Sequence, residues 1–358
     1  MNKKTILHFT YSLGRGGAEV MLVRVLKELK EYKNVVVEFY GNNAFGNEIE
    51  CDEYISMNLR SVFSLPGAII RLRKIIRSRE IDIVHTHLFW PTIIARLATP
   101  CNVTLITTIH TTVSSALDYK KWYVRFIDRY TCRFRKSTII AVSEGALKDY
   151  LSFLKKKPYK FFLLHTFADT DLFAPVITMR LNARNNFLLV SIGALRPGKN
   201  FEYLITALAG MKGVELHIYG EGCQRNKLEK LIEEYKAPVV LKGEVSSVQH
   251  VLPLYDLYVS ASSFEGFSLA VLEAMSMKIP LLLSDIPSYM EQCGDSANYF
   301  GLKEVEDFKL KLDHCMNNGS DLESRAITAH KRVLENFTLD NHTAGLRKIY
   351  TESLAEVS

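Results

Sequence analysis

The second half of the sequence holds two cations and two carboxylates at spacings suited to chemistry. Arg196 and Lys199 lie three positions apart in a turn rich in glycine and proline. A forked guanidinium and a point-charge ammonium so placed can converge on one pyrophosphate; two cations on a solvated turn are the alternative. Glu265 precedes a glycine, and Glu273 follows eight positions later among Ala, Leu and Met residues. Because a glutamate on so apolar a helix is rarely buried without a partner, the pattern favours a bound ligand.

Glycines follow several strand candidates and mark points where a ligand can approach the backbone closely. They are Gly16, Gly17, Gly193, Gly220 and Gly266. Beyond Gly266, residues Phe267, Ser268 and Leu269 are expected to begin a helix, whose free amides can hold an anion. A turn that needs glycine only for its geometry is the alternative at Gly16.

The glycine-rich turn near the N-terminus does not fit a nicotinamide site. It reads Gly14-Arg15-Gly16-Gly17, which is not the G-x-G-x-x-G pattern. The second strand candidate ends in Tyr40-Gly41-Asn42, so no acidic residue is present to hold a ribose. A dinucleotide-dependent oxidoreductase is therefore disfavoured.

Two further strand candidates end in histidine. His85 and His87 alternate in an extended segment and point to the same side, but no third ligand lies at a spacing suited to a metal ion. We therefore expect no metal site there. His110 closes the next strand, where it can hydrogen-bond a ligand hydroxyl or a developing charge. A structural histidine satisfied by the backbone is the alternative.

Short apolar segments alternate with helical patterns along the whole chain, as in βαβ units with a parallel sheet. The expected strands are Thr5–Phe9, Val35–Tyr40, Ile81–His85, Val103–Ile109, Thr138–Val142, Phe187–Ile192, Val214–Tyr219, Val239–Lys242, Leu257–Ser260 and Pro280–Ser284. The expected helices include Ala18–Glu31, Phe201–Ala209, Gln224–Tyr235 and Leu269–Met277. A polar stretch at Thr178–Asn186 interrupts the pattern. We predict an α/β protein of two Rossmann-like, doubly wound lobes, residues 1–172 and 173–340, with ligands at the strand ends in a cleft between them.

Composition and length agree with two ordinary globular domains. The chain has 358 residues, 47% apolar and 23% charged, which excludes disordered and collagen-like classes. The six cysteines are widely spaced and contain no C-x-x-C, so a disulfide framework is not expected. No run of about 18 apolar residues is present, and the apolar stretch near the N-terminus is too short for a secretory signal. We therefore expect a cytoplasmic protein.

The charge is distributed unevenly between the halves. Residues 1–170 carry 26 Lys and Arg against 15 Asp and Glu, or +11, and residues 171–358 carry 19 against 24, or −5. The basic half is expected to meet an anionic partner, and the candidates are nucleic acid, acidic lipid headgroups and a phosphorylated substrate.

Taken together, the motifs resemble those of the retaining, nucleotide-sugar-dependent glycosyltransferases of family 4, which have the GT-B fold. The matching segments, in chain order, are Gly16–Glu19, Val84–His87, His110, Ser143-Glu144, Gly193–Asn200, Gly220–Gly222 and the E-x7-E pattern from Glu265 to Glu273. Each segment alone is weakly specific, but their order and spacing are strongly so and cover nearly the whole chain. In this fold the C-terminal helix, here residues 341–358, would pack back on the first lobe.

The resemblance implies how a nucleotide-sugar donor would be held. Arg196 and Lys199 would neutralise the departing diphosphate with help from the amides of Gly266, Phe267, Ser268 and Leu269. Breaking a glycosyl–phosphate bond builds negative charge on the diphosphate, so fixed cations there lower the barrier. The resemblance thus implies that no metal and no other cofactor is needed, because protein cations do this work.

The same resemblance assigns the remaining site residues. Glu273 would hold the ribose, Lys242 and Glu244 would flank the base, and Glu265 would meet the sugar hydroxyls as a nucleophile or a positioning group. His110 would face the sugar from the other lobe. The Gly16-Gly17 turn would give the diphosphate and the acceptor room, and Gly193 and Gly220 would line the donor side. The implied activity is a hexosyl- or N-acetylhexosaminyl-transferase that uses a UDP-sugar.

The acceptor side is expected in the basic half. Trp122, Phe126, Tyr130 and Phe134 recur every four residues, beside cations at the same spacing. Such a helix could lie on an anionic membrane, although a core-facing aromatic stripe with an exposed basic face is the favoured interpretation of the aromatics. A second basic cluster is formed by Arg71, Arg73, Lys74, Arg77 and Arg79. We expect attachment to the inner face of the membrane and a glycan or lipid-diphosphate-linked acceptor.

Three other functions share some of these features. A nucleic-acid protein would explain the basic half, but no recognised nucleic-acid module is present and we expect no such partner. A nucleotide-sugar epimerase can have the same architecture, and it differs in its product. A non-catalytic binding protein is disfavoured because the donor cations and both glutamates are present.

Overall fold

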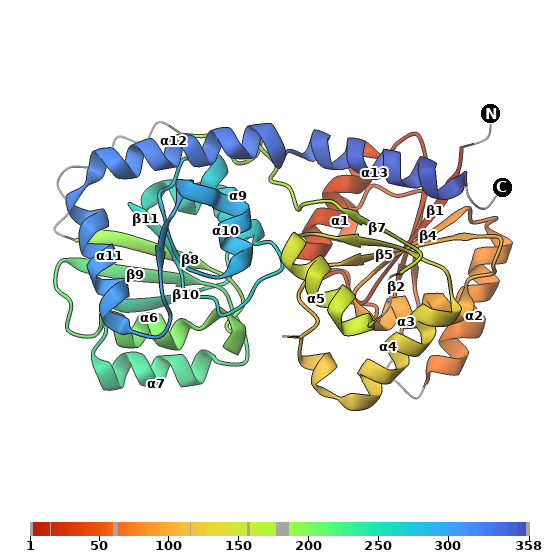
Figure 1. Cartoon of the computed structure of the whole chain (residues 1–358), viewed down its shortest axis with the longest axis horizontal. Coiled ribbons are helices and arrows are strands. Elements are labelled where there is room, and N and C mark those ends of the chain that lie inside the picture. Colours follow the sequence, from red (N-terminus) through yellow and green to blue (C-terminus); the bar gives the residue numbers. More distant parts are fainter. Residues whose placement is uncertain are drawn as a thin grey trace. The chain divides into compact units, whose positions relative to one another are not determined.

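The computed structural model describes residues 3–14, 16–59, 64–114, 116–155, 158–176 and 186–355. The chain divides into two compact units (Figure 1). Unit 1 comprises Met1–Thr166 and Leu339–Ser358, and unit 2 comprises Phe167–Thr338. Most of the polar stretch predicted at Thr178–Asn186 lies outside the described residues.

Unit 1 contains a seven-stranded parallel sheet in the order β3-β2-β1-β4-β5-β6-β7. Its strands are β1 (Thr5–Thr10), β2 (Lys33–Glu38), β3 (Glu53–Ser56), β4 (Ile83–His87), β5 (Thr104–Ile109), β6 (Thr138–Ala141) and β7 (Lys160–Leu163). Its α-helices are α1 (Gly17–Glu28), α2 (Leu65–Ser78), α3 (Phe89–Ala98), α4 (Trp122–Phe134), α5 (Glu144–Leu154) and α13 (Leu339–Leu354).

Successive side chains of a strand point to opposite faces of the sheet, and each face of this sheet packs against a different set of helices. On one face, Leu7, Val35 and Val84 pack against Leu72 and Ile94 of α2 and α3. The other face carries α1 and α13 (Figure 1). Both faces are therefore buried, which explains the nearly continuous apolar runs in β1, β2 and β4.

The C-terminal helix α13 packs on unit 1 across a long sequence separation. The ring of Tyr350 is fully buried, and its hydroxyl lies 2.7 Å from Nδ1 of His85. Arg347 pairs with Glu31 and also donates to the carbonyl of Glu28 at 2.6 Å. These contacts join α13 to β4 and α1. Unit 1 is therefore built from two segments that are far apart in the sequence.

Unit 2 contains a six-stranded parallel sheet in the order β10-β9-β8-β11-β12-β13. Its strands are β8 (Phe187–Ile192), β9 (Val214–Tyr219), β10 (Val239–Gly243), β11 (Leu257–Ser260), β12 (Leu281–Ser284) and β13 (Asn298–Phe300). Its α-helices are α6 (Phe201–Leu208), α7 (Arg225–Tyr235), α8 (Val248–Val251), α9 (Leu269–Ser276), α10 (Pro287–Cys293), α11 (Val305–Asn317) and α12 (Gly319–Asn336). Helices α6, α7 and α11 bury Leu204, Leu228 and Phe308 against one face.

The predicted fold class, two doubly wound parallel-sheet lobes, is confirmed. The sequence analysis missed β3, β7 and β13, which lie at the edges of the sheets. These strands have three or four residues and are partly exposed. In β3 and β13 the continuous apolar run that marks a central strand is also absent. All six cysteines are free thiols. Within the described ranges, no helix combines the length and the apolar character needed to cross a bilayer.

A buried ion pair joins the helices on the α3 side of unit 1. Arg96 of α3 pairs with Asp128 of α4, and their side chains are 0% and 1% exposed. Tyr119 donates to the second carboxylate oxygen of Asp128 at 2.7 Å, and Arg96 donates to the hydroxyl of Tyr150 on α5 at 3.0 Å. Since every charge here has a partner, this cluster determines how α4 is held against the sheet.

We expect Asp128→Asn to destabilise unit 1 by about 3–5 kcal/mol, because it leaves the Arg96 charge buried without its counter-ion. Both tryptophans of the chain, Trp90 and Trp122, lie in unit 1, so urea unfolding followed by tryptophan fluorescence reports on this unit. The control is Lys30→Met, which removes an exposed pair with Glu50 and should leave the midpoint unchanged. An unchanged midpoint for Asp128→Asn would show that the cluster does not hold α4.

Candidate functional site

The candidate site in unit 2 is built around an ion pair between Lys199 and Glu265. Nζ of Lys199 lies 2.7 Å from Oε1 of Glu265, and the side chains are 13% and 10% exposed. Lys199 ends the turn that follows β8, and Glu265 lies in the loop after β11. These strands are neighbours in the sheet, so parallel pairing brings both loops to the same edge. A largely buried cation thus lies directly beside the carboxylate that the sequence analysis singled out.

A chain of hydroxyl groups holds the Glu265 carboxylate. Ser262 donates to Oε1 of Glu265 at 2.8 Å, Ser260 lies 3.2 Å from Ser262, and the Tyr289 hydroxyl lies 2.8 Å from Ser260. Because Ser262 uses its only proton on the carboxylate, it accepts from Ser260, which in turn accepts from Tyr289. Every hydroxyl therefore donates toward Glu265, and this chain fixes the orientation of the carboxylate.

The turn that carries Lys199 is bound to its neighbours by close backbone approaches. Gly198 accepts from the amide of Ser263 at 3.0 Å. A Cβ atom on Gly193 would lie 2.8 Å from Cε of Lys199, so glycine there leaves space for the lysine stem. Gly220 has φ +143°, and a Cβ on it would collide with the carbonyl oxygen of Gly193. These two glycines are needed for the conformation of the site loops.

The other predicted donor residues of unit 2 have different environments. Arg196 is exposed and forms no ion pair with any residue in the described ranges, whereas Lys199 is engaged by Glu265. Lys242 and Glu244 are exposed at and just beyond the end of β10. The structure therefore brings Lys199 and Glu265 together, while Arg196 extends into solvent from the same turn.

Helix α9 begins after Ser268 and carries Glu273 in a buried position. The amide of Ser268 donates to Oε1 of Gln292 at 3.0 Å, so it is already satisfied within the protein. Burial raises the pKa of Tyr258 above its usual range, and the carboxylates of Glu265 and Glu273 raise it further. Both glutamates of the E-x7-E pattern thus lie near one buried tyrosine of β11.

In unit 1, His110 follows β5 and contacts His87. Nε2 of His110 lies 3.0 Å from Nδ1 of His87, the last residue of β4. Burial lowers the pKa of His110 to about 4, and burial with neighbouring histidines holds the pKa of His87 well below its usual value. Both imidazoles are therefore neutral at pH 7, and His110 can offer an N–H or a lone pair but no fixed positive charge.

The Gly16-Gly17 turn leads into α1, with Gly16 as its N-cap. A Cβ on Gly16 would collide with the carboxylate of Glu19, and burial raises the pKa of that carboxyl group. The first turn of α1 thus already holds a carboxylate near its amides. An anion that binds at this helix end would have to share the site with Glu19.

Sequence reasoning missed the residues that position the site. Ser260 lies in β11, and Tyr289 and Gln292 lie in α10. They act through contacts with distant segments, and a single hydroxyl or amide in a strand or helix carries no distinctive pattern. His8 was also missed, although a histidine inside the apolar β1 segment is an unusual residue for a buried strand. That oddity was the one available signal.

The aromatic residues of α4 are exposed, which corrects the favoured interpretation that they face the core. The exposed fractions are 77% for Trp122, 61% for Phe126, 55% for Tyr130 and 69% for Phe134. The buried side of α4 is instead formed by Val124, Asp128 and Thr131. The Arg96–Asp128 pair takes the place of an apolar seam, so the aromatic side of the helix faces solvent.

The basic cluster of α2 is partly used within the protein. Arg71 donates to the carbonyl of Met57 at 2.8 Å, Arg73 donates to that of Leu97 at 2.8 Å, and Arg79 pairs with Glu53. Lys74 and Arg77 are exposed and form no ion pair within the part of the chain that the structure describes. The cationic surface of α2 is therefore smaller than the sequence indicated.

The two halves of the chain match two families of glycosyltransferase domains. Residues 15–172 match the family described as Glycosyltransferase Family 4. Residues 180–333 match the family described as Glycosyl transferases group 1.

Bacterial glycosyltransferases are among the proteins similar to this chain. The chain is 26% identical over 313 residues to N-acetylgalactosamine-N,N'-diacetylbacillosaminyl-diphospho-undecaprenol 4-alpha-N-acetylgalactosaminyltransferase of Campylobacter jejuni, covering 83% of this chain and 85% of that protein. It is 25% identical over 315 residues to UDP-Gal:alpha-D-GlcNAc-diphosphoundecaprenol alpha-1,3-galactosyltransferase of Escherichia coli, covering 75% and 79%. Among solved structures, Alr3699/HepE of Anabaena in complex with UDP-glucose superposes with a TM-score of 0.85 at 16% identity, covering 97% of this chain and 99% of that one. This likeness confirms the fold.

We expect Gly220→Ala to loosen the loops that carry Lys199, because the new methyl group collides with the Gly193 carbonyl. The opening free energy of β8 and β9 should fall by about 2 kcal/mol. Hydrogen–deuterium exchange of peptides from residues 187–222 measures this fall. The control is Gly319→Ala, at the start of α12, where a Cβ meets no atom within 4 Å. Equal protection in the two variants would contradict the role assigned to Gly220.

Proposed function

Because the chain consists of two glycosyltransferase domains, we propose that it moves a hexosyl or N-acetylhexosaminyl group from a UDP-sugar to a lipid-diphosphate-linked saccharide, with retention of configuration and without a metal at the donor. The observation that carries this proposal is the Lys199–Glu265 pair at 2.7 Å. It lies in the segment that matches the group 1 family. The proposed role is synthesis of a bacterial-type surface polysaccharide or glycoconjugate.

In the proposed mechanism, the residues of unit 2 bind the donor and stabilise its leaving group. Lys199 and the exposed Arg196 meet the diphosphate and stabilise the negative charge that forms as the glycosyl bond breaks. The ammonium of Lys199 can turn from Glu265 to a phosphate oxygen without losing its counter-charge. Glu273 takes the ribose, with Lys242 and Glu244 beside the base.

Glu265 is the proposed carboxylate at the reacting sugar. The three hydroxyls from Tyr289 to Ser262 hold it in one orientation. In that orientation it accepts hydrogen bonds from the sugar hydroxyls and stabilises positive charge on the reacting carbon. A neutral His110 contributes a hydrogen bond to the same sugar and adds no charge.

The acceptor assignment is supported by the relatives and by the surface of unit 1. Both relatives have names that specify diphospho-undecaprenol or diphosphoundecaprenol compounds. The exposed aromatics of α4 alternate with Lys121, Arg125, Arg129 and Arg133. Exposed aromatic rings among cations match the chemistry of an anionic membrane surface, where rings enter the headgroup layer and cations meet phosphates. We therefore propose peripheral attachment through α4.

The first test is turnover with UDP-, GDP- and ADP-sugars, followed by product analysis. We expect a UDP-sugar to be used and Lys199→Ala, Glu265→Ala and His110→Ala each to lower turnover by about 10²- to 10³-fold while the protein remains folded. Matched controls are Lys212→Ala, Glu323→Ala and His314→Ala, which change exposed residues.

Two outcomes would contradict the assignment. Full activity in all three site variants would refute the proposed residues. A changed sugar still attached to its nucleotide, formed without any acceptor, would identify an epimerase.

The second test is sedimentation with vesicles. The wild-type protein should sediment with anionic vesicles and not with neutral ones at moderate salt, and Trp122→Ala with Phe126→Ala should weaken binding by about tenfold or more. The control is Tyr235→Ala, which removes an exposed aromatic ring of α7 in unit 2. Equal sedimentation of wild type with both vesicle types, or no effect of the double variant, would refute attachment through α4.

A further inference from the structure

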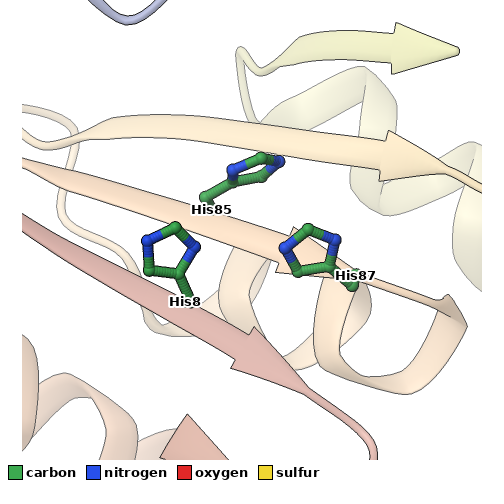
Figure 2. A group of neighbouring side chains, drawn as sticks. All are labelled: His8, His85 and His87. Atoms are coloured by element: carbon green, nitrogen blue, oxygen red, sulfur yellow. The ribbon is translucent and has the colours of Figure 1, made fainter. Parts of the chain in front are cut away.

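Three buried histidines lie together on the α1 and α13 side of the unit 1 sheet. His8 comes from β1, and His85 and His87 come from β4. His8 pairs with His85 in the strand register, so all three rings point to the same face, as Figure 2 shows. One donor nitrogen from each ring lies within 4.8 Å of the other two. The sequence analysis expected no metal site because it found no third ligand, and the fold supplies one.

Two of these rings have a nitrogen that is buried and without a partner. Nδ1 of His8 and Nε2 of His87 have no hydrogen-bond partner among the described residues. The three histidines line a cavity of about 30 Å³, together with Met21, Leu22 and Leu346 among other residues. Unpaired buried nitrogens are costly unless an ion or a water molecule binds them.

The contacts of His8 show that its open nitrogen carries a lone pair. Asn34 donates through Nδ2 to the carbonyl of Leu29 at 2.9 Å, which directs its Oδ1 toward Nε2 of His8 at 3.3 Å. An amide oxygen only accepts, so Nε2 of His8 carries the proton and Nδ1 is a bare lone pair. Such a contact behind a ligand is the usual way in which a metal-binding imidazole is oriented.

His87 has a matching arrangement. Its Nδ1 lies 3.0 Å from Nε2 of His110, and its Nε2 is the nitrogen without a partner among the described residues. His85 has both nitrogens within 2.7 Å of hydroxyl groups, those of Tyr350 and Thr108. Rotation of the Thr108 side chain about its Cα–Cβ bond moves its hydroxyl and frees Nε2 of His85, while the hydroxyl of the fully buried Tyr350 accepts the N–H of Nδ1.

We propose that His8, His85 and His87 bind one zinc-type transition-metal ion in unit 1. The donor set contains three imidazoles and neither carboxylate nor thiolate, which suits Zn²⁺ and disfavours Mg²⁺ and Ca²⁺. A tetrahedral ion needs its donor atoms about 3.3 Å apart, so the rings close around it by small rotations. The fourth position is taken by a water molecule or hydroxide in the cavity.

The ion has a direct consequence for His110. When Nε2 of His87 binds the metal, the only proton of that ring is on Nδ1, so Nδ1 donates to Nε2 of His110. The proton of His110 is then on its own Nδ1. Metal binding thus selects one direction for a hydrogen bond that otherwise has two, without changing any net charge on the histidines.

The test uses the full chain without a histidine tag, stripped with a chelator and loaded with Zn²⁺. After gel filtration, elemental analysis should find about one zinc per chain, and the same procedure with Mg²⁺ or Ca²⁺ should find none. His8→Gln and His87→Gln should each weaken zinc binding by at least about 100-fold. Absence of retained zinc in the wild-type protein would overturn the proposal.

Two controls exclude other sites. His314→Gln changes an exposed histidine near Asp321, and Cys101→Ser with Cys223→Ser removes the two exposed thiols; both variants should retain zinc. Loss of zinc in either control would place the ion elsewhere and overturn the proposal.

A second measurement needs no variant and holds even if the histidine variants fail to fold. X-ray absorption of the zinc-loaded wild-type protein should show three imidazole nitrogens at about 2.0 Å and no sulfur. Sulfur ligands, or a shell of oxygen alone, would refute the site. Because one measurement counts the metal, the other identifies its ligands and neither needs substrate, their failure would leave the proposed sugar transfer untouched.

Discussion

The ion pair between Lys199 and Glu265 is the interaction on which the candidate site depends. A lysine and a glutamate that are this far buried are each costly in isolation, and their mutual attraction at 2.7 Å offsets that cost. The pair also requires the turn after β8 and the loop after β11 to stay in contact, which the glycines at 193, 198 and 220 permit. A ligand phosphate can replace one half of this pair, because it supplies the same negative charge to the ammonium.

In unit 1, too, buried polar side chains depend on partners from other elements. Its buried polar residues are satisfied across long sequence separations: Arg96 by Asp128 and Tyr150, and His85 by Tyr350 and Thr108. Several buried polar atoms of unit 1 nevertheless have no partner among the described residues, and two of them, Nδ1 of His8 and Nε2 of His87, belong to residues that line one small cavity. Two unpaired nitrogens on residues of one cavity are the physical basis for a binding site there.

The surface of unit 1 shows why an amphipathic pattern does not identify the buried side of a helix. Periodicity in α4 correctly indicates a helix with an aromatic side, but either side could face the sheet. Asp128 of α4 is buried because it pairs with Arg96, and this pair also contacts Tyr119 and Tyr150. The polar side of α4 therefore faces the protein interior. The rings of Trp122 and Phe126 therefore remain in solvent, beside cations of the same helix.

Local patterns in the sequence were sufficient to predict the fold class, the central strands of both sheets, and the loops that carry Lys199, Glu265 and His110. These features could be predicted because apolar runs, glycines and charged residues at strand ends depend on neighbouring residues in the sequence. The partners of those residues could not be predicted. Ser260, Tyr289 and His8 become part of a site only when strand order brings distant segments side by side, and the pairing of β1 with β4 is a property of the whole sheet. Tertiary structure alone decided which polar groups meet, because hydrogen bonds depend on positions in space and leave no periodic signal along the chain.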